Sequence, residues 1–397
     1  MRILLLHNHY QQPGGEDRVF EADSALLSSH GHDVVPFTVH NAEVAKVGTL
    51  ALGIRTVWNH AMYRRIRSLI RARHPDVLHV HNTLPLLSPA VYHAASAEGV
   101  PVVQTLHNFR LACPNALLFR DGHPCEECLG QGFAWQGVKH GCYRGSRVAT
   151  GAVATMVAVH RLIGTWSHTI DAYIALTEFA RRKFIQAGLP GSKIIVKPNF
   201  MQWDPGVGTG RGGYALYVGR LSPEKGIATL LDAWERFSPA LPLKIIGDGP
   251  MASRVREAVS RSHSIQWVGS KSHDEVVSEM KDATVLVFPS ECYEGFPNTI
   301  AEAYAVGLPV IGGNVGAMTS LIKDGASGLL FRPGDSKDLA ERLGWITRHQ
   351  SEFVSMRQKA REEYDDKYTA ERNYELLVGI YRQVVTNKLS RKHGDLT

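Results

Sequence analysis

The strongest constraint on the fold is an alternation of short apolar runs with helical stretches, which occurs twice along the chain. The runs are nearly continuous in apolar residues, a pattern typical of parallel strands that helices cover on both faces. In the first series, strands are predicted at 2–8, 33–39, 76–81, 100–106, 172–176 and 193–198, with helices near 16–30, 55–73 and 88–98. In the second series, strands are predicted at 214–219, 241–247, 264–269, 283–289 and 308–313.

A segment rich in glycine and proline, residues 198–213, separates the two series. Two βαβ series joined by one linker predict an α/β protein with two doubly wound, Rossmann-like domains. We expect these domains at 1–200 and 201–367. The last region, 368–397, is predicted to be helical and to pack back on one of the domains, with the N-terminal domain as the expected partner. Ligands of such sheets bind beyond the carboxyl ends of the strands, so we expect the site in a cleft between the domains.

The net charge of +6 is unevenly distributed over the 397 residues. Residues 1–200 contain 20 Lys and Arg against 13 Asp and Glu, and they hold 15 of the 19 histidines. This asymmetry indicates an anionic partner for the N-terminal half. The N-terminus has no signal-peptide pattern, and the most apolar stretch, 148–163, is interrupted by His160 and Arg161 below membrane-spanning length. We therefore expect a cytoplasmic protein without a transmembrane helix.

Glycine-rich turns follow several predicted strands and offer places for an anion. Gly14 and Gly15 precede a helix that begins near Glu16. Glycines there let the backbone approach an anion at a helix N-terminus, although a plain turn is the more common role of such a pair. Gly247 and Gly249, in "GDGP", form another turn at a strand end, where structural and binding roles are equally open.

Two cations follow the first strand of the second predicted domain, in "VGRLSPEKG" at 218–226. Arg220 and Lys225 lie on a loop that opens a helix. Two cations beside a helix N-terminus suit a diphosphate. Solvated surface charges are an equally open alternative for this pair.

Two glutamates stand eight positions apart in "YEGFPNTIAEA" at 293–303, and a turn and the start of a helix lie between them. One carboxylate, from Glu294 or Glu302, can hold sugar hydroxyls while the other holds ribose hydroxyls. The amides of Asn298 and Thr299, at the helix start, can face phosphate. The alternative is that Glu294 caps the turn and Glu302 is an exposed helix residue.

In this order, the motifs resemble the retaining glycosyltransferases of family 4, which have the two-domain GT-B fold. The resemblance spans most of the chain and rests on Gly14-Gly15-Glu16, His107 in "TLHNF", "GRLSPEKG", "GDGP" and the E-x7-E element from Glu294 to Glu302. It implies a nucleotide-diphosphate sugar donor bound mainly by the C-terminal domain. It also implies an acceptor bound mainly by the N-terminal domain.

The resemblance further implies a role for each matching residue. Arg220 and Lys225 would hold the donor diphosphate and stabilise the departing nucleotide. Glu294 would bind hydroxyls of the transferred sugar, and His107 would contact that sugar from the opposite wall of the cleft. Glu302 would hold the ribose. The other positions implied to bind the donor are Gly14, Gly15, Gly219, Gly247, Gly249, Asn298 and Thr299.

No cofactor is expected for catalysis. The chain contains no Asp-x-Asp element, which accompanies a divalent metal in other transferases. Preorganised cations and helix amides can stabilise the leaving diphosphate instead. The resemblance implies a substitution on one face of the sugar, with the phosphate assisting acceptor deprotonation, and it assigns no nucleophile.

Four of the five cysteines lie close together in the chain, in a predicted insertion at 108–146 that follows His107. Cys113, Cys125, Cys128 and Cys142 have the spacing C-x11-C-x2-C-x13-C. This spacing fits a tetrahedral structural zinc site in an intracellular chain, where disulfides are not expected. Reduced cysteines without metal are the alternative, and His123 and His140 are substitute ligands. The chain in this respect resembles bacterial members of the family with a cysteine-bearing insertion. Cys292 is expected to stand alone near the donor site.

Residues 44–75 contain no acid, and their apolar residues recur at helical spacing. A helix there would bury one face and display arginines near Trp58 and Tyr63. These arginines could rest on anionic lipid headgroups at the inner face of the cell membrane, which would suit a lipid-linked glycan acceptor. A solvated outer helix is equally open. The basic residues are Lys46, Arg55, Arg64, Arg65, Arg67, Arg71 and Arg73.

Three other function classes compete with this prediction. A GT-B transferase with a small soluble acceptor shares every donor residue and is the main competitor. A sugar-nucleotide epimerase shares the architecture but not the order of the motifs. A nucleic-acid binder would suit the basic charge, yet a phosphate-backbone binder does not need paired carboxylates in its cleft, so no nucleic acid is expected. The sugar, the base and the acceptor have no portable sequence motif.

Overall fold

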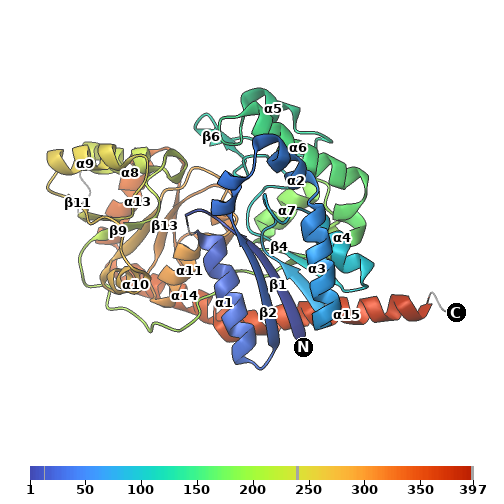
Figure 1. Cartoon of the computed structure of the whole chain (residues 1–397). Coiled ribbons are helices and arrows are strands. Elements are labelled where there is room, and N and C mark those ends of the chain that lie inside the picture. The colour runs from blue at the N-terminus through green and yellow to red at the C-terminus, as the bar shows by residue number, and fades with distance from the viewer. Residues whose placement is uncertain (13, 238–240, 395–397) are drawn as a thin grey trace. The chain divides into compact units, whose positions relative to one another are not determined.

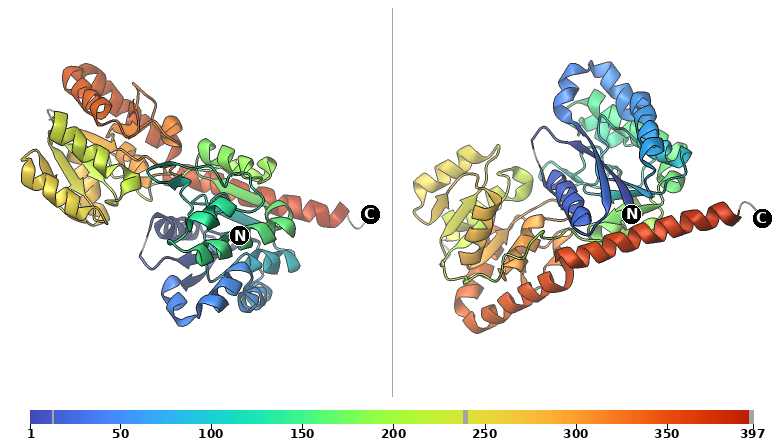
Figure 2. Two further views of the ribbon diagram at one scale, coloured as in Figure 1. Left: turned by 90° about the horizontal axis from the view of Figure 1, so that it is seen from above. Right: turned by 60° about the horizontal axis from the view of Figure 1, so that its bottom comes forward.

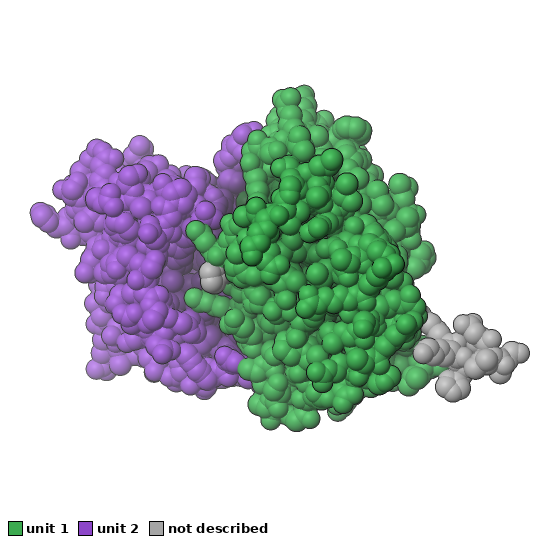
Figure 3. Space-filling view, viewed as in Figure 1, with its two compact units in different colours: residues 1–118, 125–198, 373–397 green, residues 119–124, 199–372 purple. Residues whose placement is uncertain are grey.

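The structure is a computed structural model that describes residues 1–12, 14–237 and 241–394. It contains two compact units, coloured separately in Figure 3. Each unit has its own six-stranded sheet, and each sheet is built from consecutive strand–helix repeats (Figure 1). Unit 1 comprises Met1–Leu118, Cys125–Pro198 and Asn373–Thr397, and unit 2 comprises Phe119–Pro124 and Asn199–Arg372.

All strands of the unit 1 sheet pair in parallel, in the order β2-β1-β3-β4-β7-β8. The central strand β1 is buried from Ile3 to Leu6, as its unbroken apolar run predicts. Its Ile3 is paired with Val34 on one side and Val77 on the other. The strands are β1 (Arg2–His9), β2 (Asp33–His40), β3 (Val77–Val80), β4 (Val102–Leu106), β7 (Ala172–Ala175) and β8 (Ile194–Val196).

Helices connect these strands, and their first turns show why they begin where they do. In the first helix, α1, Asp17 accepts a hydrogen bond from the backbone N–H of Gly14 (2.7 Å), and acidic residues in a first turn complement the helix dipole. The helices are α1 (Gly15–Ser29), α2 (Thr49–Val57), α3 (His60–Arg73), α4 (Ala90–Ala97), α5 (Trp135–His140), α6 (Arg147–Leu162) and α7 (Glu178–Gln186). The 3₁₀ helices η1 (Asn41–Lys46) and η3 (Gly191–Lys193), the π-helix η2 (Thr165–Thr169) and a small hairpin, β5 (Phe119–Arg120) with β6 (His123–Pro124), complete the segment up to 198.

The region predicted as one helix at 55–73 is helical, but two helices occupy it in place of one. Trp58, just after α2, is extended, and Asn59 is the N-cap of α3. The Asn59 side chain accepts a hydrogen bond from the Met62 backbone N–H (3.2 Å) and donates one to the Leu86 carbonyl (2.6 Å). An asparagine that caps a new helix competes with continuation of the old one, which explains the break.

Unit 2 repeats the architecture, with parallel strands in the order β11-β10-β9-β12-β13-β14. The sequence did not predict β14, whose four residues begin with a glycine. The strands are β9 (Ala215–Val218), β10 (Leu243–Ile246), β11 (Ile265–Trp267), β12 (Val285–Phe288), β13 (Val310–Gly313) and β14 (Gly328–Phe331). The helices are η4 (Pro223–Lys225), α8 (Ile227–Phe237), α9 (Ala252–Arg261), α10 (His273–Asp282), α11 (Asn298–Ala305), α12 (Met318–Leu321), α13 (Ser336–Arg348) and α14 (Gln350–Lys367).

The last helix, α15 (Ala370–Gly394), lies within the region 368–397 that was predicted to be helical (Figure 2). Thr369 caps its start by accepting a hydrogen bond from the Arg372 backbone N–H (3.3 Å). Its buried residues Leu377 and Tyr381 join the same core cluster as Ile3 and Leu5 of β1. Each such buried side chain contributes about 1.5–3 kcal/mol, so this helix is part of the unit 1 core.

The most apolar stretch of the sequence forms α6, which packs along α2 and α5 within unit 1 (Figure 1). Within the described residues, no helix combines the length and the apolar composition needed to cross a membrane.

Candidate functional site

The loops that follow β9, β10 and β12 contact one another at the carboxyl ends of these strands in unit 2. The backbone N–H of Leu221 donates to the Asp248 carbonyl (2.9 Å), and that of Glu291 donates to the Glu224 carbonyl (3.0 Å). Neighbouring parallel strands all end at one edge of the sheet, which is where ligands of such sheets bind. The three motifs "GRLSPEKG", "GDGP" and "YEGFPNTIAEA" therefore meet at one place.

At the centre of this region, Lys225 and Glu294 form an ion pair. The lysine Nζ lies 2.5 Å from the glutamate Oε1, and the two side chains are only 27% and 14% exposed. Ser290 donates from its Oγ to the same carboxylate oxygen (2.7 Å). Lys225 ends η4, and Glu294 follows β12, so the pair joins residues 69 positions apart in sequence.

The electrostatics of the pair keep both partners charged. Burial by itself would raise the pKa of Glu294, but the Lys225 ammonium and the hydrogen bonds outweigh burial and lower it. Burial would likewise lower the pKa of Lys225, yet the Glu294 carboxylate raises it above its ordinary value. A charged lysine beside a fixed carboxylate is thus available at the strand ends near neutral pH.

Close approach of the loops explains the motif glycines. A Cβ on Gly226, where φ is +69°, would lie 2.0 Å from the Pro289 carbonyl oxygen. A Cβ on Gly247, where φ is +134°, would lie 1.9 Å from the Gly219 carbonyl oxygen, and one on Gly249 would lie 2.5 Å from that of Leu221. Packing of backbone on backbone accounts for Gly247 and Gly249, and their predicted contact with a donor stays a prediction.

Arg220 is the exposed member of the predicted diphosphate pair. Its backbone is fixed, because its carbonyl accepts hydrogen bonds from the Tyr217 hydroxyl (2.9 Å) and the Ser222 N–H (3.0 Å). Gly219, just before it, is held near the same tyrosine, since a Cβ there would lie 3.1 Å from the Tyr217 hydroxyl. A fixed backbone with an exposed guanidinium is a suitable arrangement for binding an anion.

The second half of the glutamate motif lies on α11 and has different partners. Glu302 Oε1 lies 3.2 Å from His273 Nε2. Asn298, the first residue of α11, accepts a hydrogen bond on its side-chain oxygen from the Asn199 amide (2.8 Å), and Thr299 follows it half-buried. The structure therefore places Glu294 with Lys225 and Glu302 with a histidine of α10, each on its own side of the turn.

In unit 1, the predicted Gly14–Gly15 turn does begin a helix, but a side chain fills the role expected of an anion. Asp17 accepts from the Gly14 backbone N–H (2.7 Å), and its other oxygen contacts His7 (2.7 Å) and His9 (3.2 Å). A Cβ on Gly14 would meet nothing closer than 3.8 Å, so sterics do not demand glycine at this position.

The loop after β1 is tied to the loop after β4, which carries His107. Glu16 accepts hydrogen bonds from the Tyr10 hydroxyl (2.9 Å) and from the Asn108 side-chain amide. Burial raises the pKa of Glu16, although these two hydrogen bonds and Arg110 oppose the shift. The sequence motifs around Gly14 and His107 are thus brought together within unit 1.

His107 is half-buried and belongs to a polar cluster beneath these loops. Its Nε2 lies 3.0 Å from Nδ1 of His81, and the two rings stack at 5.1 Å. Burial, followed by the nearby His7 and Lys197, lowers the pKa of His107 to about 3. The ring also lines a small cavity of about 40 Å³, together with Gln104 and Asn108. His107 is therefore a neutral imidazole near neutral pH.

Sequence reasoning missed most of this cluster, which also contains His7, Asp17, Asp23 and His81. A signal was present in the sequence, because histidines stand two positions apart at the ends of two strands. These are His7 with His9 and His79 with His81. Polar residues at the carboxyl ends of parallel strands are candidates for a site. The two aspartates lie on α1 and carry no such signal.

The four clustered cysteines are reduced and are joined by two backbone links. The Leu118 N–H donates to the Cys113 sulfur, and the Leu118 carbonyl accepts from the Cys125 N–H (2.8 Å). The Gly137 N–H donates to the Cys128 sulfur, and its carbonyl accepts from the Cys142 N–H (3.0 Å). Burial, with the three other cysteines adding to it, raises the pKa of Cys128 to about 11.

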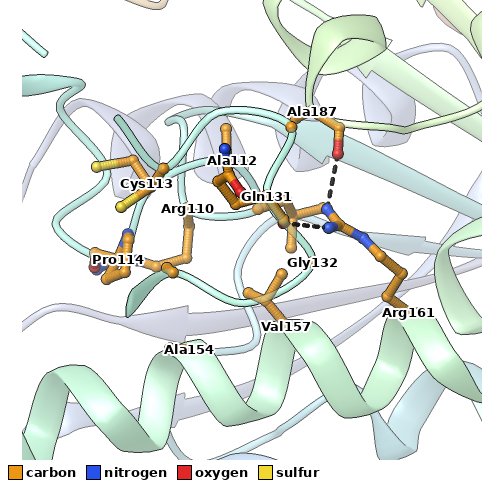
Figure 4. A pocket seen from close by; sticks show the side chains of 14 residues that line it. Arg110, Ala112, Cys113, Pro114, Gln131, Gly132, Ala154, Val157, Arg161 and Ala187 are labelled. Carbon is orange, nitrogen blue, oxygen red and sulfur yellow. Dashed lines mark hydrogen bonds between the residues drawn. The ribbon is translucent and has the colours of Figure 1, made fainter. Parts of the chain in front are cut away.

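The cysteine segment is anchored to the body of unit 1 by Arg161 of α6. Its guanidinium donates to the Gln131 carbonyl (2.6 Å) and to the Ala187 carbonyl (2.7 Å), as the dashed lines in Figure 4 show. Cys113 and Pro114, both labelled in Figure 4, line the small pocket beside it, and Cys128 also belongs to its lining. Among the described residues, two clusters bring ligand-type atoms within 4.8 Å of one another, and neither contains a cysteine: His7–His9–Asp17 and Asp23–His79–His81.

The basic segment at 44–75 is less uniformly solvated than predicted. Arg67 and Arg71 both contact Glu98, at 2.5 and 2.9 Å, and Arg65 lies over the Phe37 ring. The prediction that the apolar residues form one buried face is wrong for Ile54, which is 62% exposed. It lies near Leu50, which is 80% exposed. The break between α2 and α3 explains this, because the two helices present different faces.

Comparison with known proteins agrees with this architecture. Residues 14–199 match the family described as a glycosyl transferase 4-like domain, and residues 209–363 match the family described as glycosyl transferases group 1. An uncharacterized glycosyltransferase of Methanocaldococcus jannaschii is 35% identical over 33% of this chain and 37% of its own length. A putative teichuronic acid biosynthesis glycosyltransferase of Bacillus subtilis is 26% identical over 74% of this chain and 67% of its own.

Solved structures extend the likeness to the whole fold. Anabaena HepE in complex with UDP has a TM-score of 0.68 at 18% identity, covering 98% of this chain and 100% of that one. The fold and the strand-end site thus define the GT-B class. Both halves of the chain match glycosyltransferase domain families, and the chain has the GT-B fold. The predicted fold class is confirmed, whereas the retaining family 4 assignment and the cysteine-bearing insertion stay predictions.

Proposed function

We propose that this chain transfers a hexose from a nucleotide-diphosphate sugar to a glycan or lipid-linked acceptor and retains the configuration at the anomeric carbon. The observation that carries the proposal is the Lys225–Glu294 pair, 2.5 Å apart, at the strand ends of unit 2. A cation beside a carboxylate serves the two halves of such a donor, because one binds phosphate and the other binds sugar hydroxyls. HepE, similar in fold, is described in complex with UDP-glucose, which supports this choice of donor.

In this proposal, the diphosphate lies between Arg220, Lys225 and the N-terminus of α11, where the amides of Asn298 and Thr299 add a partial positive charge. These groups stabilise the negative charge that develops on the departing nucleoside diphosphate. They are held in place before reaction, so little reorganisation is needed. Binding and leaving-group stabilisation thus come from the chain's own side chains, and no catalytic cofactor is proposed.

The two carboxylates bind different parts of the donor outside the diphosphate. Glu294 binds hydroxyls of the transferred sugar, and its contact strengthens as the sugar ring flattens toward an oxocarbenium-like state. Glu302 holds the ribose. His107 contacts the sugar as a neutral imidazole. No side chain is assigned as a nucleophile, because the leaving phosphate can take the acceptor proton on the same face.

A transfer assay with a panel of UDP- and GDP-sugars tests this proposal, with product stereochemistry read by NMR. Glu294→Ala should lower turnover by an amount equivalent to about 2–4 kcal/mol, whereas Glu302→Ala should chiefly weaken donor binding. Glu257→Ala, on the exposed face of α9, is the matched control and should change neither. Transfer with inversion, or normal kinetics in both site variants, would contradict the proposal.

For the acceptor, we propose a glycan or a lipid-linked glycan rather than a small soluble molecule. Unit 1 contains the basic half of the sequence, and its α2 exposes Leu50 and Ile54 beside the cations Lys46 and Arg55. Exposed apolar residues flanked by cations suit peripheral contact with an anionic membrane. A transferase with a soluble acceptor would make all the same donor contacts. Only the identity of the acceptor distinguishes it from the transferase proposed here.

We propose a structural zinc ion at the four clustered cysteines, outside the catalytic chemistry. Four thiolates fill a tetrahedral shell and leave no open position for a substrate. Backbone N–H groups donate hydrogen bonds to the sulfurs of Cys113 and Cys128. Such hydrogen bonds suit thiolate ligands, because they stabilise negative charge on sulfur. The four sulfurs would have to draw closer on binding, which couples the metal to folding of this segment.

A further inference from the structure

A continuous line of polar side chains runs through the core of unit 1 and ends at His107. It begins with Lys197, whose Nζ lies 4.0 Å from Oδ1 of Asp23. The other oxygen of Asp23 lies 3.7 Å from Nε2 of His81, and Nδ1 of His81 lies 3.0 Å from Nε2 of His107. Lys197, Asp23 and His81 are exposed by no more than 3%, so three of the four members lie in the protein interior.

Three atoms of this line, on two residues, are left without a conventional hydrogen bond. Among the described residues, neither oxygen of Asp23 nor Nε2 of His81 has a hydrogen-bond partner within the usual distance. A buried carboxylate and a buried ring nitrogen that face each other at 3.7 Å are each other's nearest candidate partners. Leaving both unsatisfied costs free energy, so a small approach of the two groups is favoured.

A metal ion bound at this cluster is the competing interpretation, because ligand-type atoms of Asp23, His79 and His81 lie within 4.8 Å of one another. Both nitrogens of His79 are already engaged, however: Nδ1 with the Tyr381 hydroxyl at 2.7 Å and Nε2 with the Thr105 hydroxyl at 2.8 Å. The lysine that faces the aspartate would also repel a divalent ion. A hydrogen-bond chain fits these contacts better.

The direction of each hydrogen bond along this line of side chains then follows from the groups at its two ends. Burial lowers the pKa values of His81 and His107, so both rings are neutral and each carries one proton. If the aspartate accepts from Nε2 of His81, then Nδ1 of His81 has a lone pair and must accept from Nε2 of His107. Because a neutral imidazole has only one N–H, Nδ1 of His107 is then left with a lone pair.

We propose that Asp23, acting through His81, is a positioning residue that fixes the tautomer of His107, so that His107 presents Nδ1 as a hydrogen-bond acceptor for a donor-sugar hydroxyl. The sugar contact rests on the proposed function, whereas the tautomer is a property of unit 1 alone. Neither Asp23 nor His81 touches the substrate. Their effect is to hold the acceptor nitrogen and the ring plane of His107 in one state.

Asp23→Asn reverses the donor and acceptor roles along this line of side chains, starting at the contact between residue 23 and His81. The asparagine oxygen stays toward Lys197, so its NH₂ group faces Nε2 of His81 and donates to it. His81 then carries its proton on Nδ1 and donates to Nε2 of His107, and His107 is left with its proton on Nδ1. The nitrogen that met the sugar as an acceptor thus becomes a donor.

Tautomers are read by long-range ¹H–¹⁵N correlation spectra of the full-length protein labelled with ¹⁵N-histidine. In the wild-type protein we expect both His81 and His107 to carry the proton on Nε2, and in Asp23→Asn we expect both to carry it on Nδ1. Tyr381→Phe, which alters the same core next to His79, should leave the wild-type tautomers unchanged. A wild-type His107 protonated on Nδ1 would overturn the proposal, and this result does not depend on any variant folding.

Kinetics supply the second readout. Asp23→Asn should lower kcat at least about tenfold with a small change in donor KM, and adding it to His107→Ala should lower kcat no further. An additive loss in the double variant would overturn the proposal, because it would show that Asp23 acts independently of His107. Normal activity in His107→Ala, with the expected tautomers, would refute the sugar contact in the proposed function and leave the tautomer assignment standing.

Discussion

Lys225 Nζ and Glu294 Oε1 lie 2.5 Å apart in a pair that is more than two-thirds buried on both sides. Removing either partner leaves a charge in a poorly solvated place, so Lys225→Met and Glu294→Gln should each destabilise unit 2 by about 2 kcal/mol. The double variant should lose less than the sum of the two. Denaturant unfolding of all four proteins measures this, and strict additivity would show that the two groups are not coupled.

The same pair predicts a pH dependence of stability. The folded pKa of Glu294 is lowered, so its contribution is complete above the unfolded value near 4.5 and is lost as pH falls through the lower folded pKa. The folded pKa of Lys225 is raised, so its contribution is complete below the unfolded value near 10.5 and is lost only above it. The stability difference between wild type and Lys225→Met should therefore be flat from about pH 5 to 10 and shrink in stronger acid. A difference that changes around pH 7 would contradict this assignment.

Gly226 tests whether the motif glycines are required by packing. An alanine there adds left-handed strain of about 1–2 kcal/mol and also pushes its Cβ toward the Pro289 carbonyl oxygen, 2.0 Å away. Gly269, with a similar φ of +73° and nothing within 4 Å of its Cβ, is the matched control. Gly226→Ala should lower the melting temperature clearly more than Gly269→Ala. Equal losses would mean that the loop relaxes freely.

The repeated strand–helix pattern predicted both sheets, because parallel strands buried on both faces leave long apolar runs in the sequence. It failed at β14, where four residues beginning with Gly328 carry too little pattern, and at Asn59, where a local cap overrides a continuous helical period. In the site, the sequence predicted that Lys225 and Glu294 share a region. It did not predict their ion pair, because pairing across 69 residues depends on tertiary structure. Asp23 was missed for the same reason, since nothing near it in sequence marks it as buried.

The zinc proposal predicts metal content and local order together. Protein purified without an affinity tag should contain about one zinc ion per chain, as a single four-thiolate site requires. Cys125→Ser combined with Cys128→Ser should release it and expose the segment at 108–146 to protease, while impairing acceptor use more than donor binding. Cys292→Ser, outside the cluster, should retain the metal. A chain purified with negligible zinc and an ordered insertion would refute the site.

Membrane contact is predicted to depend on α2. The wild-type protein should co-sediment with phosphatidylglycerol vesicles at low salt and much less with phosphatidylcholine vesicles, since both apolar insertion and cations contribute. Leu50→Ser with Ile54→Ser should weaken binding strongly. Val354→Ser, which changes a 68% exposed residue of unit 2, is the control and should not. Equal binding by the α2 variant would place the contact elsewhere or remove it.

The most direct test of the account is whether the strand ends of unit 2 bind a nucleoside diphosphate through Arg220 and Lys225. Thermal unfolding of the full chain with UDP, GDP and their sugars, in the presence of EDTA and with protein zinc content verified, measures this without knowledge of the acceptor. One nucleotide series should raise the melting temperature, because a ligand at 100 times its Kd stabilises by about 2.7 kcal/mol. Arg220→Ala and Lys225→Met should remove most of that shift. No shift with any nucleotide, or a shift that requires added magnesium or manganese and persists in both variants, would contradict the account.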